Sequence, residues 1–111
     1  MTHIANRLEH RWGERVSVNI PVRVSAPGLV RVDGCVKNLS VSGALMRSEC
    51  ELRLHALIEI HIELPPPASR AAVLEAHVSR KFNEWVGIEW CQFAPNIVKG
   101  LLRDPAVRAT A

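Results

Sequence analysis

The chain has 111 residues, 48% of them hydrophobic and 23% charged, which suits one globular domain with its own core. Its formal net charge of +3 permits an anionic ligand but does not require nucleic acid. No stretch approaches the length of a membrane-spanning helix and the start has no apolar signal core, so we expect a cytoplasmic protein with no membrane span. Its three cysteines and five histidines have neither disulfide-framework nor metal-ligand spacing, and we expect no metal site.

Residues 1–14 are polar and charged, and they predict an N-terminal arm that is partly helical or disordered. The arm carries Arg7, Arg11 and a lone Trp12. It has few apolar residues of its own, so we expect it to become ordered only when a ligand binds.

From Arg15 the sequence alternates strictly, which predicts a strand with one buried face. The apolar residues of that face are Val16, Val18, Ile20, Val22 and Val24. Pro21 cannot donate to a β-ladder, so this strand should lie at an edge or carry a bulge there. A turn at residues 26–28 leads into a second extended segment over 29–39, in which Asp33-Gly34 marks either a hairpin or a bulge.

A tight turn over 40–43 is followed by a short apolar strand over 44–46. Further alternation predicts strands over 56–64, 71–82 and 85–93, and Asn83-Glu84 is a turn between the last two. Beyond Pro95, apolar residues at helical spacing over 97–102 predict a short helix that covers one mouth of the sheet. We therefore expect one all-β domain over 15–103, a small antiparallel barrel or sandwich, followed by a frayed tail over 104–111.

Catalytic patterns are missing from the sequence. The serines lie outside any G-x-S-x-G elbow, and the glycines form no phosphate-binding loop. The carboxylates are scattered over polar strand faces. We therefore expect a binding protein and not an enzyme, with no cofactor.

Two short motifs stand together on this pattern. Residues 11–15, Arg-Trp-Gly-Glu-Arg, form an R-x-x-x-R directly before the first strand, and residues 38–43, Asn-Leu-Ser-Val-Ser-Gly, form an N-x-S-x-x-G at a strand-to-strand turn. In these motifs the sequence resembles the PilZ family, in which an R-x-x-x-R arm precedes the first strand and a [D/N]-x-S-x-x-G turn follows the second. A strand like residues 87–90, Gly-Ile-Glu-Trp, and a following helix also match the family.

The resemblance implies a six-stranded antiparallel β-barrel of the PilZ-like, split-barrel type with a flexible N-terminal arm and a short C-terminal helix. It implies the ligand cyclic di-GMP, a bacterial second messenger, and an unidentified downstream protein as partner. By this resemblance the binding residues are Arg11, Arg15, Asn38, Ser40 and Gly43. Arginine can grip phosphates, pair with guanine O6 and N7, or stack on bases, and asparagine can contact a guanine edge. Glycine at the end of the turn adopts a conformation closed to other residues and lets the ligand approach.

Three further residues are secondary candidates: Arg7, His10 and Ser42. Arg7 and Arg11 repeat the four-residue spacing, and we choose Arg11 with Arg15 because Arg15 abuts the strand. The residue before the motif influences how many ligands bind in the family, so His10 leaves one or two cyclic di-GMP molecules open.

Other interpretations of the two motifs and of the function remain open. The arginines could be solvated charges paired with Glu9 or Glu14, and Asn38, Ser40 and Gly43 could be only a favourable turn. A ligand-independent interaction module of the same fold ranks second among the functions. A small barrel that binds RNA or single-stranded DNA ranks third, because the chain has few aromatic residues for base stacking.

Overall fold

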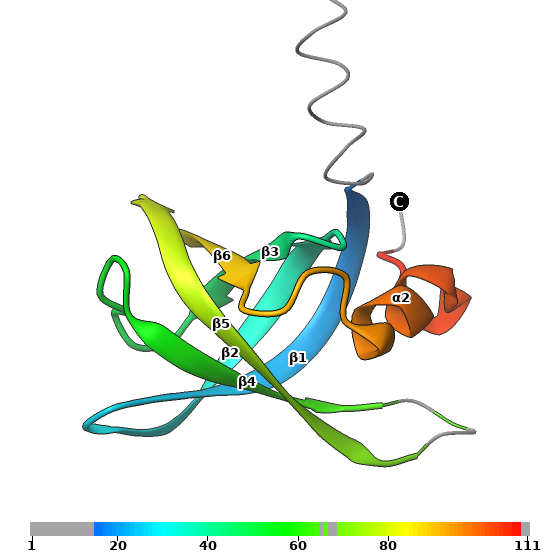
Figure 1. The fold of residues 1–111 in the computed structure, drawn as a ribbon, viewed down its shortest axis with the longest axis horizontal. Coiled ribbons are helices and arrows are strands. Elements are labelled where there is room, and N and C mark those ends of the chain that lie inside the picture. The colour runs from blue at the N-terminus through cyan, green and yellow to red at the C-terminus, as the bar shows by residue number, and fades with distance from the viewer. Residues whose placement is uncertain (1–14, 65, 67–68, 110–111) are drawn as a thin grey trace, which may run out of the picture.

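The structure is a computed structural model that describes residues 15–64, 66 and 69–109. These residues form six strands, one α-helix and a short 3-10 helix, in the order drawn in Figure 1. The strands are β1 (Val16–Ala26), β2 (Leu29–Leu39), β3 (Gly43–Ser48), β4 (Leu57–Glu63), β5 (Ala71–Phe82) and β6 (Trp85–Trp90), and the helices are α2 (Asn96–Arg103) and η1 (Pro105–Val107). Among the described residues, no helix has the length and apolar character needed to cross a membrane.

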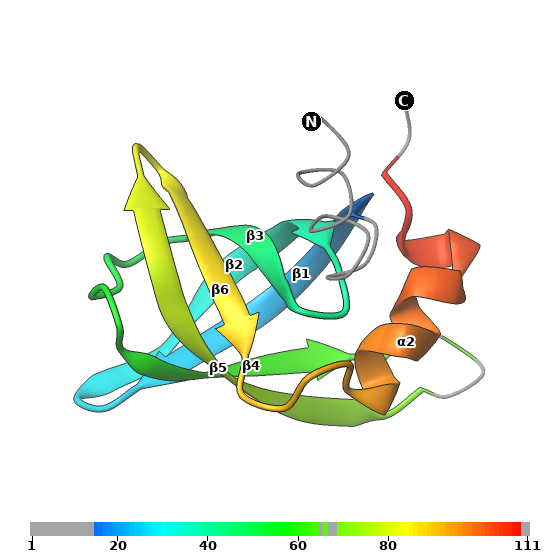
Figure 2. The ribbon, with the colours of Figure 1, turned by 45° about the horizontal axis from the view of Figure 1, so that its top comes forward.

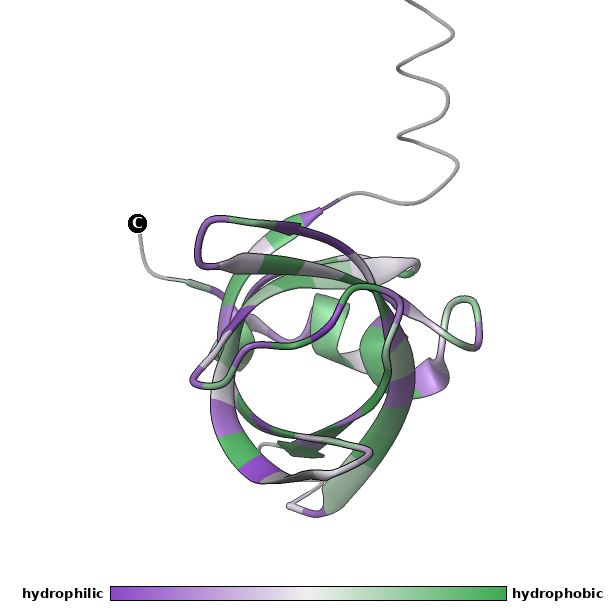
Figure 3. Cartoon of the chain, turned by 90° about the vertical axis from the view of Figure 1, so that its left-hand side faces the viewer, coloured by the Kyte–Doolittle hydropathy of each residue, from purple (hydrophilic) through white to green (hydrophobic). Residues whose placement is uncertain are grey.

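The strands close into an antiparallel barrel in the order β1-β2-β3-β6-β5-β4. Figure 3 looks into this closed ring from the end opposite α2. The ring closes where Val22–Ser25 of β1 pair with Glu59–Ile62 of β4. The predicted six-stranded all-β barrel is therefore confirmed, and the sandwich alternative is excluded.

Alternating side chains from every strand fill the interior of the barrel, as the period of two requires. Ile60 of β4 is fully buried, and truncating it to alanine would cost roughly 2–5 kcal/mol of unfolding free energy. Helix α2 covers one mouth of the barrel beside β1 (Figures 1 and 2) and buries Val98 and Leu101 against the core. The predicted position of the helix is thus confirmed.

The structure tests two expectations about strand irregularities, one at Pro21 and one at Asp33-Gly34. In the closed barrel β1 lies between β2 and β4 and is no edge strand, and its register shifts against β2 lie on either side of Pro21 and not at it. Pro21 pairs with Cys35 of β2, while the pairing with β4 begins one residue later, at Val22. Asp33-Gly34 forms no hairpin, because both residues continue β2 and pair with β1. The register shift of β2 against β3 comes later, between Val36 and Asn38. Gly34 is needed instead because a Cβ there would lie 2.8 Å from the carbonyl oxygen of Arg47.

The expected frayed tail is wrong for residues 104–109. The Asp104 side chain accepts a hydrogen bond from the N–H of Ala106 at 2.9 Å, and Val107 is buried. Arg108 forms a β-bridge with Val18, and the N–H of Ala109 donates to the carbonyl oxygen of Ser17 at 3.1 Å. The tail is ordered because one apolar side chain anchors it against the start of β1.

The predicted arm, residues 1–14, lies outside the described residues. The same holds for Arg7, His10, Arg11 and Trp12. The structure therefore places Arg15 as the one described member of the R-x-x-x-R motif.

Candidate ligand-binding site

A pocket of about 320 Å³ opens beside the turn between β2 and β3. Four of the residues singled out in the sequence line it: Arg15, Ser40, Ser42 and Gly43. The remaining lining residues come from β3, β5 and β6: Ala44, Ser79, Arg80, Gly87, Ile88 and Glu89. The fold thus brings the end of the first motif to the turn of the second.

Ser40 is committed to the turn itself. It is only 3% exposed, and its hydroxyl accepts a hydrogen bond from the N–H of Gly43 at 3.3 Å. The same Oγ lies 3.1 Å from Ser42 Oγ, while the N–H of Ser40 donates to the Gly43 carbonyl at 2.9 Å. The indole N–H of Trp90 donates to the Ser40 carbonyl at 3.1 Å. These bonds tie the turn to β6 and leave the Ser40 hydroxyl little capacity for a ligand.

Gly43 is required by strand packing. Its φ is not positive, so the expectation of a turn conformation closed to other residues is wrong. A Cβ at this position would lie 2.0 Å from the carbonyl oxygen of Ile88. Gly43 therefore allows β3 and β6 to approach each other at the floor of the pocket.

Asn38 lies next to the pocket without lining it. It pairs with Ser17 on β1 and with Leu45 on β3. Within the described part of the chain, its side-chain Oδ1 is buried and has no hydrogen-bond partner. Such an orphaned acceptor costs roughly 1–3 kcal/mol, so this atom can gain from a bound donor.

The charges around the pocket favour an anion. Arg15 and Arg80 line it, and neither has a carboxylate partner within salt-bridge distance among residues 15–64, 66 and 69–109. Glu89 is the opposing charge, and its carboxylate lies 3.3 Å from His77 Nε2. Two arginines and one glutamate therefore line the pocket, and that glutamate has a histidine beside it.

The sequence motifs missed the contribution of β5 and β6, namely Ser79, Arg80, Gly87 and Glu89. A signal was present in the predicted two-residue turn at Asn83-Glu84. Counting outward from that turn pairs residue 82 with 85, 81 with 86, and 80 with 87, as the structure has it. That count pairs Arg80 with Gly87 across the hairpin, which puts a cation next to a position without a side chain.

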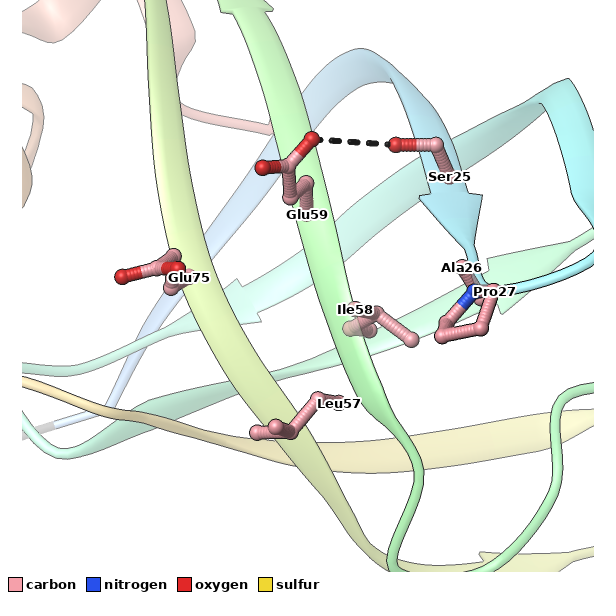
Figure 4. A pocket seen from close by; sticks show the side chains of 7 residues that line it. All are labelled: Ser25, Ala26, Pro27, Leu57, Ile58, Glu59 and Glu75. Atoms are coloured by element: carbon pink, nitrogen blue, oxygen red, sulfur yellow. Dashed lines mark hydrogen bonds between the residues drawn. The ribbon is translucent and has the colours of Figure 1, made fainter.

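A second hollow, of about 330 Å³, lies between the β1–β2 hairpin and the β4–β5 pair and includes none of the motif residues. Figure 4 shows Ser25 donating a hydrogen bond to Glu59, at 3.3 Å. Ser25 Oγ and Glu59 both approach the same nitrogen of His61, Nε2, at 3.1 and 3.5 Å. A catalytic triad needs serine and carboxylate on opposite ring nitrogens, so this cluster lacks triad geometry. Among the described residues, no three potential metal ligands gather in one place.

Comparison with known proteins places this barrel in a family. The family model described as PilZ domain matches residues 5–104. A search of curated proteins found no match. Among solved structures, the chain is similar to the crystal structure of the PilZ domain of CeSA from a cellulose-synthesizing bacterium, with a TM-score of 0.67 and 23% identity, covering 82% of this chain and 100% of that one. That likeness supports the fold, and the match to the family model shows that the chain belongs to the PilZ domain family.

Proposed function

We propose that this PilZ domain is a cyclic di-GMP receptor that signals to a partner protein. PilZ domains are generally cyclic di-GMP receptors, and they act as ligand-binding or adaptor domains. One observation carries the proposal for this chain: the pocket joins Arg15 of the first motif to Ser40, Ser42 and Gly43 of the second.

The chemistry of the pocket suits a ligand with two phosphodiesters and two guanines. The Arg15 guanidinium can bind a phosphate or the O6 and N7 atoms of guanine with two parallel hydrogen bonds. Asn38 lies beside the pocket, and its buried Oδ1 can accept from an N–H of a guanine edge once the side chain turns toward the ligand. Ser42, half-buried at the pocket wall, can offer its hydroxyl. In this proposal Ser40 and Gly43 act by holding the turn.

The proposal also assigns a role to residues 1–14. Arg11 would bind the ligand together with Arg15, and the arm would become ordered over the pocket and present a new surface to an unidentified protein. PilZ domains are typically cytoplasmic, and a cytoplasmic location is part of the proposal. Amide hydrogen exchange of residues 6–14 should slow when cyclic di-GMP is added; equal protection with and without ligand would contradict arm ordering.

Calorimetric titration tests the proposal directly. We expect cyclic di-GMP to bind with a dissociation constant of about 1 µM or tighter, a free energy near −8 kcal/mol, and GTP to bind far more weakly. The same titration yields the stoichiometry, one or two ligands per chain. Absence of heat, together with an unchanged melting temperature at millimolar cyclic di-GMP, would overturn the proposal.

A ligand-independent PilZ adaptor is the second candidate. It is favoured by the internal hydrogen bonds of Ser40 and the packing role of Gly43, because both residues have a structural reason to be present. Under this alternative, the chain would bind a partner protein equally well with and without cyclic di-GMP. A single-stranded oligonucleotide in the same titration separates both candidates from a nucleic-acid-binding barrel.

A further inference from the structure

Arg80 on β5 lies in the pocket but belongs to neither sequence motif. We propose that Arg80 is a further cyclic di-GMP-binding residue, which supplies a second guanidinium opposite the turn that carries Ser42 and Gly43. The inference rests on the proposed function and adds a residue to the same site.

A β-bulge in β5 turns the Arg80 side chain toward the pocket. Val78 pairs with Ile88 and both are buried, whereas two residues later Arg80 pairs with Gly87, so the register shifts by one at Ser79. Without the shift, alternation would direct residue 80 to the same interior side as Val78. Bulges are frequent next to binding sites because they re-aim a side chain in this way. The hydroxyl of Ser79 donates to the carbonyl of Gly87 at 3.1 Å and holds the bulge in place.

Gly87 provides the space in which the Arg80 side chain lies. A Cβ at position 87 would be 2.9 Å from Arg80 Cγ and 3.1 Å from Arg80 Nε. The far end of the side chain is also positioned, since Arg80 Cζ lies 5.6 Å from the ring centroid of Phe82. The guanidinium is therefore held by a glycine gap and an aromatic face before any ligand arrives, which reduces the entropy lost on binding.

Arg80 differs from two neighbouring cations in its charge environment. On the same β5–β6 hairpin, Lys81 Nζ lies 3.2 Å from Glu51, and Arg47 on adjacent β3 lies 2.6 Å from Glu84. Among the residues that the structure describes, no carboxylate pairs with Arg80. A planar guanidinium without a partner, in the pocket that also holds Arg15, is suited to bidentate binding of a phosphodiester or of guanine O6 and N7.

Affinity measurements on the full chain test the inference. Calorimetry with cyclic di-GMP should show that Arg80→Ala weakens binding about tenfold or more, the loss expected for a charge-assisted hydrogen bond. Gly87→Ala should weaken binding several-fold without removing a charge, because the new methyl group displaces the Arg80 side chain. Arg70→Ala is the matched control, since Arg70 is an exposed arginine just before β5, outside the pocket, and this variant should bind like the wild type.

The outcomes separate this inference from the proposed function. If the wild-type chain binds cyclic di-GMP and Arg80→Ala binds equally well, the inference is overturned and the proposed function stands. If the wild-type chain does not bind, both are overturned. Melting temperatures accompany each titration, and a loss of affinity in Arg80→Ala at an unchanged melting temperature supports a direct role in binding.

Discussion

The turn at residues 40–43 and the two residues beside it, Arg15 and Asn38, differ in how their polar groups are used. These two residues are called the rim of the pocket below. In the turn, Ser40 is buried and hydrogen-bonded to Gly43, and Gly43 leaves room for the Ile88 carbonyl. Beside the turn, Arg15 lines the pocket and is exposed, whereas the Oδ1 atom of Asn38 is buried and has no hydrogen-bond partner within the described residues. The polar groups of the turn therefore build the scaffold, while Arg15 is available to a ligand and Asn38 keeps an unused acceptor. Substitutions in the turn should act mainly on stability, and substitutions at the rim mainly on affinity.

Gly43→Ala should have the largest effect. The added Cβ would fall 2.0 Å from the Ile88 carbonyl oxygen, which is a backbone atom that cannot rotate away. Separating β3 from β6 should lower the free energy of unfolding by about 3 kcal/mol or more. Urea denaturation followed by circular dichroism measures this loss. Native-like stability of Gly43→Ala would show that the packing account of this glycine is wrong.

Arg15→Ala should show the opposite behaviour. We expect cyclic di-GMP affinity to fall about tenfold to a hundredfold, since a charge-assisted hydrogen bond contributes about 1.5–3 kcal/mol. The melting temperature should not change, because Arg15 precedes β1 and is exposed. Arg15→Lys should remain defective, since lysine keeps the charge but loses the planar fork.

Two arm variants sharpen the same measurement. Arg11→Ala should weaken binding as much as Arg15→Ala does, whereas Arg7→Ala should cost much less. If Arg7→Ala abolishes binding and Arg15→Ala does not, the chosen register of the R-x-x-x-R motif is wrong. If neither Arg11→Ala nor Arg15→Ala changes affinity, the assigned site is wrong.

Ser40→Ala should have an intermediate effect, and the effect should be on stability. It removes a buried hydroxyl that accepts from the Gly43 N–H, so unfolding free energy should fall by about 1–2 kcal/mol. Ser42→Ala is the control, because Ser42 is less buried and should tolerate the change better. A Ser40→Ala protein that keeps full stability but loses ligand affinity would mean that the hydroxyl contacts the ligand directly.

Asn38→Ala should lower affinity only modestly and should not destabilise the folded chain. The buried Oδ1 has no hydrogen-bond partner among the described residues, so its removal should leave the unfolding free energy unchanged or raise it by up to roughly 1–3 kcal/mol. Affinity for cyclic di-GMP should fall roughly threefold to tenfold, the value of one neutral hydrogen bond. A large loss of stability would instead show that Asn38 belongs with the turn.

Most of the fold could be predicted from the sequence because a strand with one buried face must alternate. Val18 to Val24 on β1 and Ile58 to Ile62 on β4 follow this rule without exception, and their burial matches it. The tail over 104–109 could not be predicted, because its order depends on a single apolar contact by Val107 and on backbone pairing with β1. Short polar segments carry no periodicity that reports such pairing.

The site was predicted in part. The motifs identified Arg15, Ser40, Ser42 and Gly43, which the fold brings to one pocket, but they misassigned the reason for Gly43. Arg80 was missed because simple alternation from Val78 would place it inside the barrel. Alternation and the count from the Asn83-Glu84 turn disagree by one residue, and the bulge at Ser79 is the physical origin of that disagreement.

The pairing of the chain's last described residues with the start of β1 has a practical consequence. Ala109 donates to Ser17, and Arg108 bridges Val18, so the C-terminal side of the domain is fastened two to three residues from Arg15. A fluorophore on the arm and another after residue 109 would both be joined to the barrel near the start of β1. A rearrangement of residues 1–14 would then change their energy transfer with little contribution from the barrel, so the domain is well suited for conversion into a fluorescent reporter of the proposed ligand.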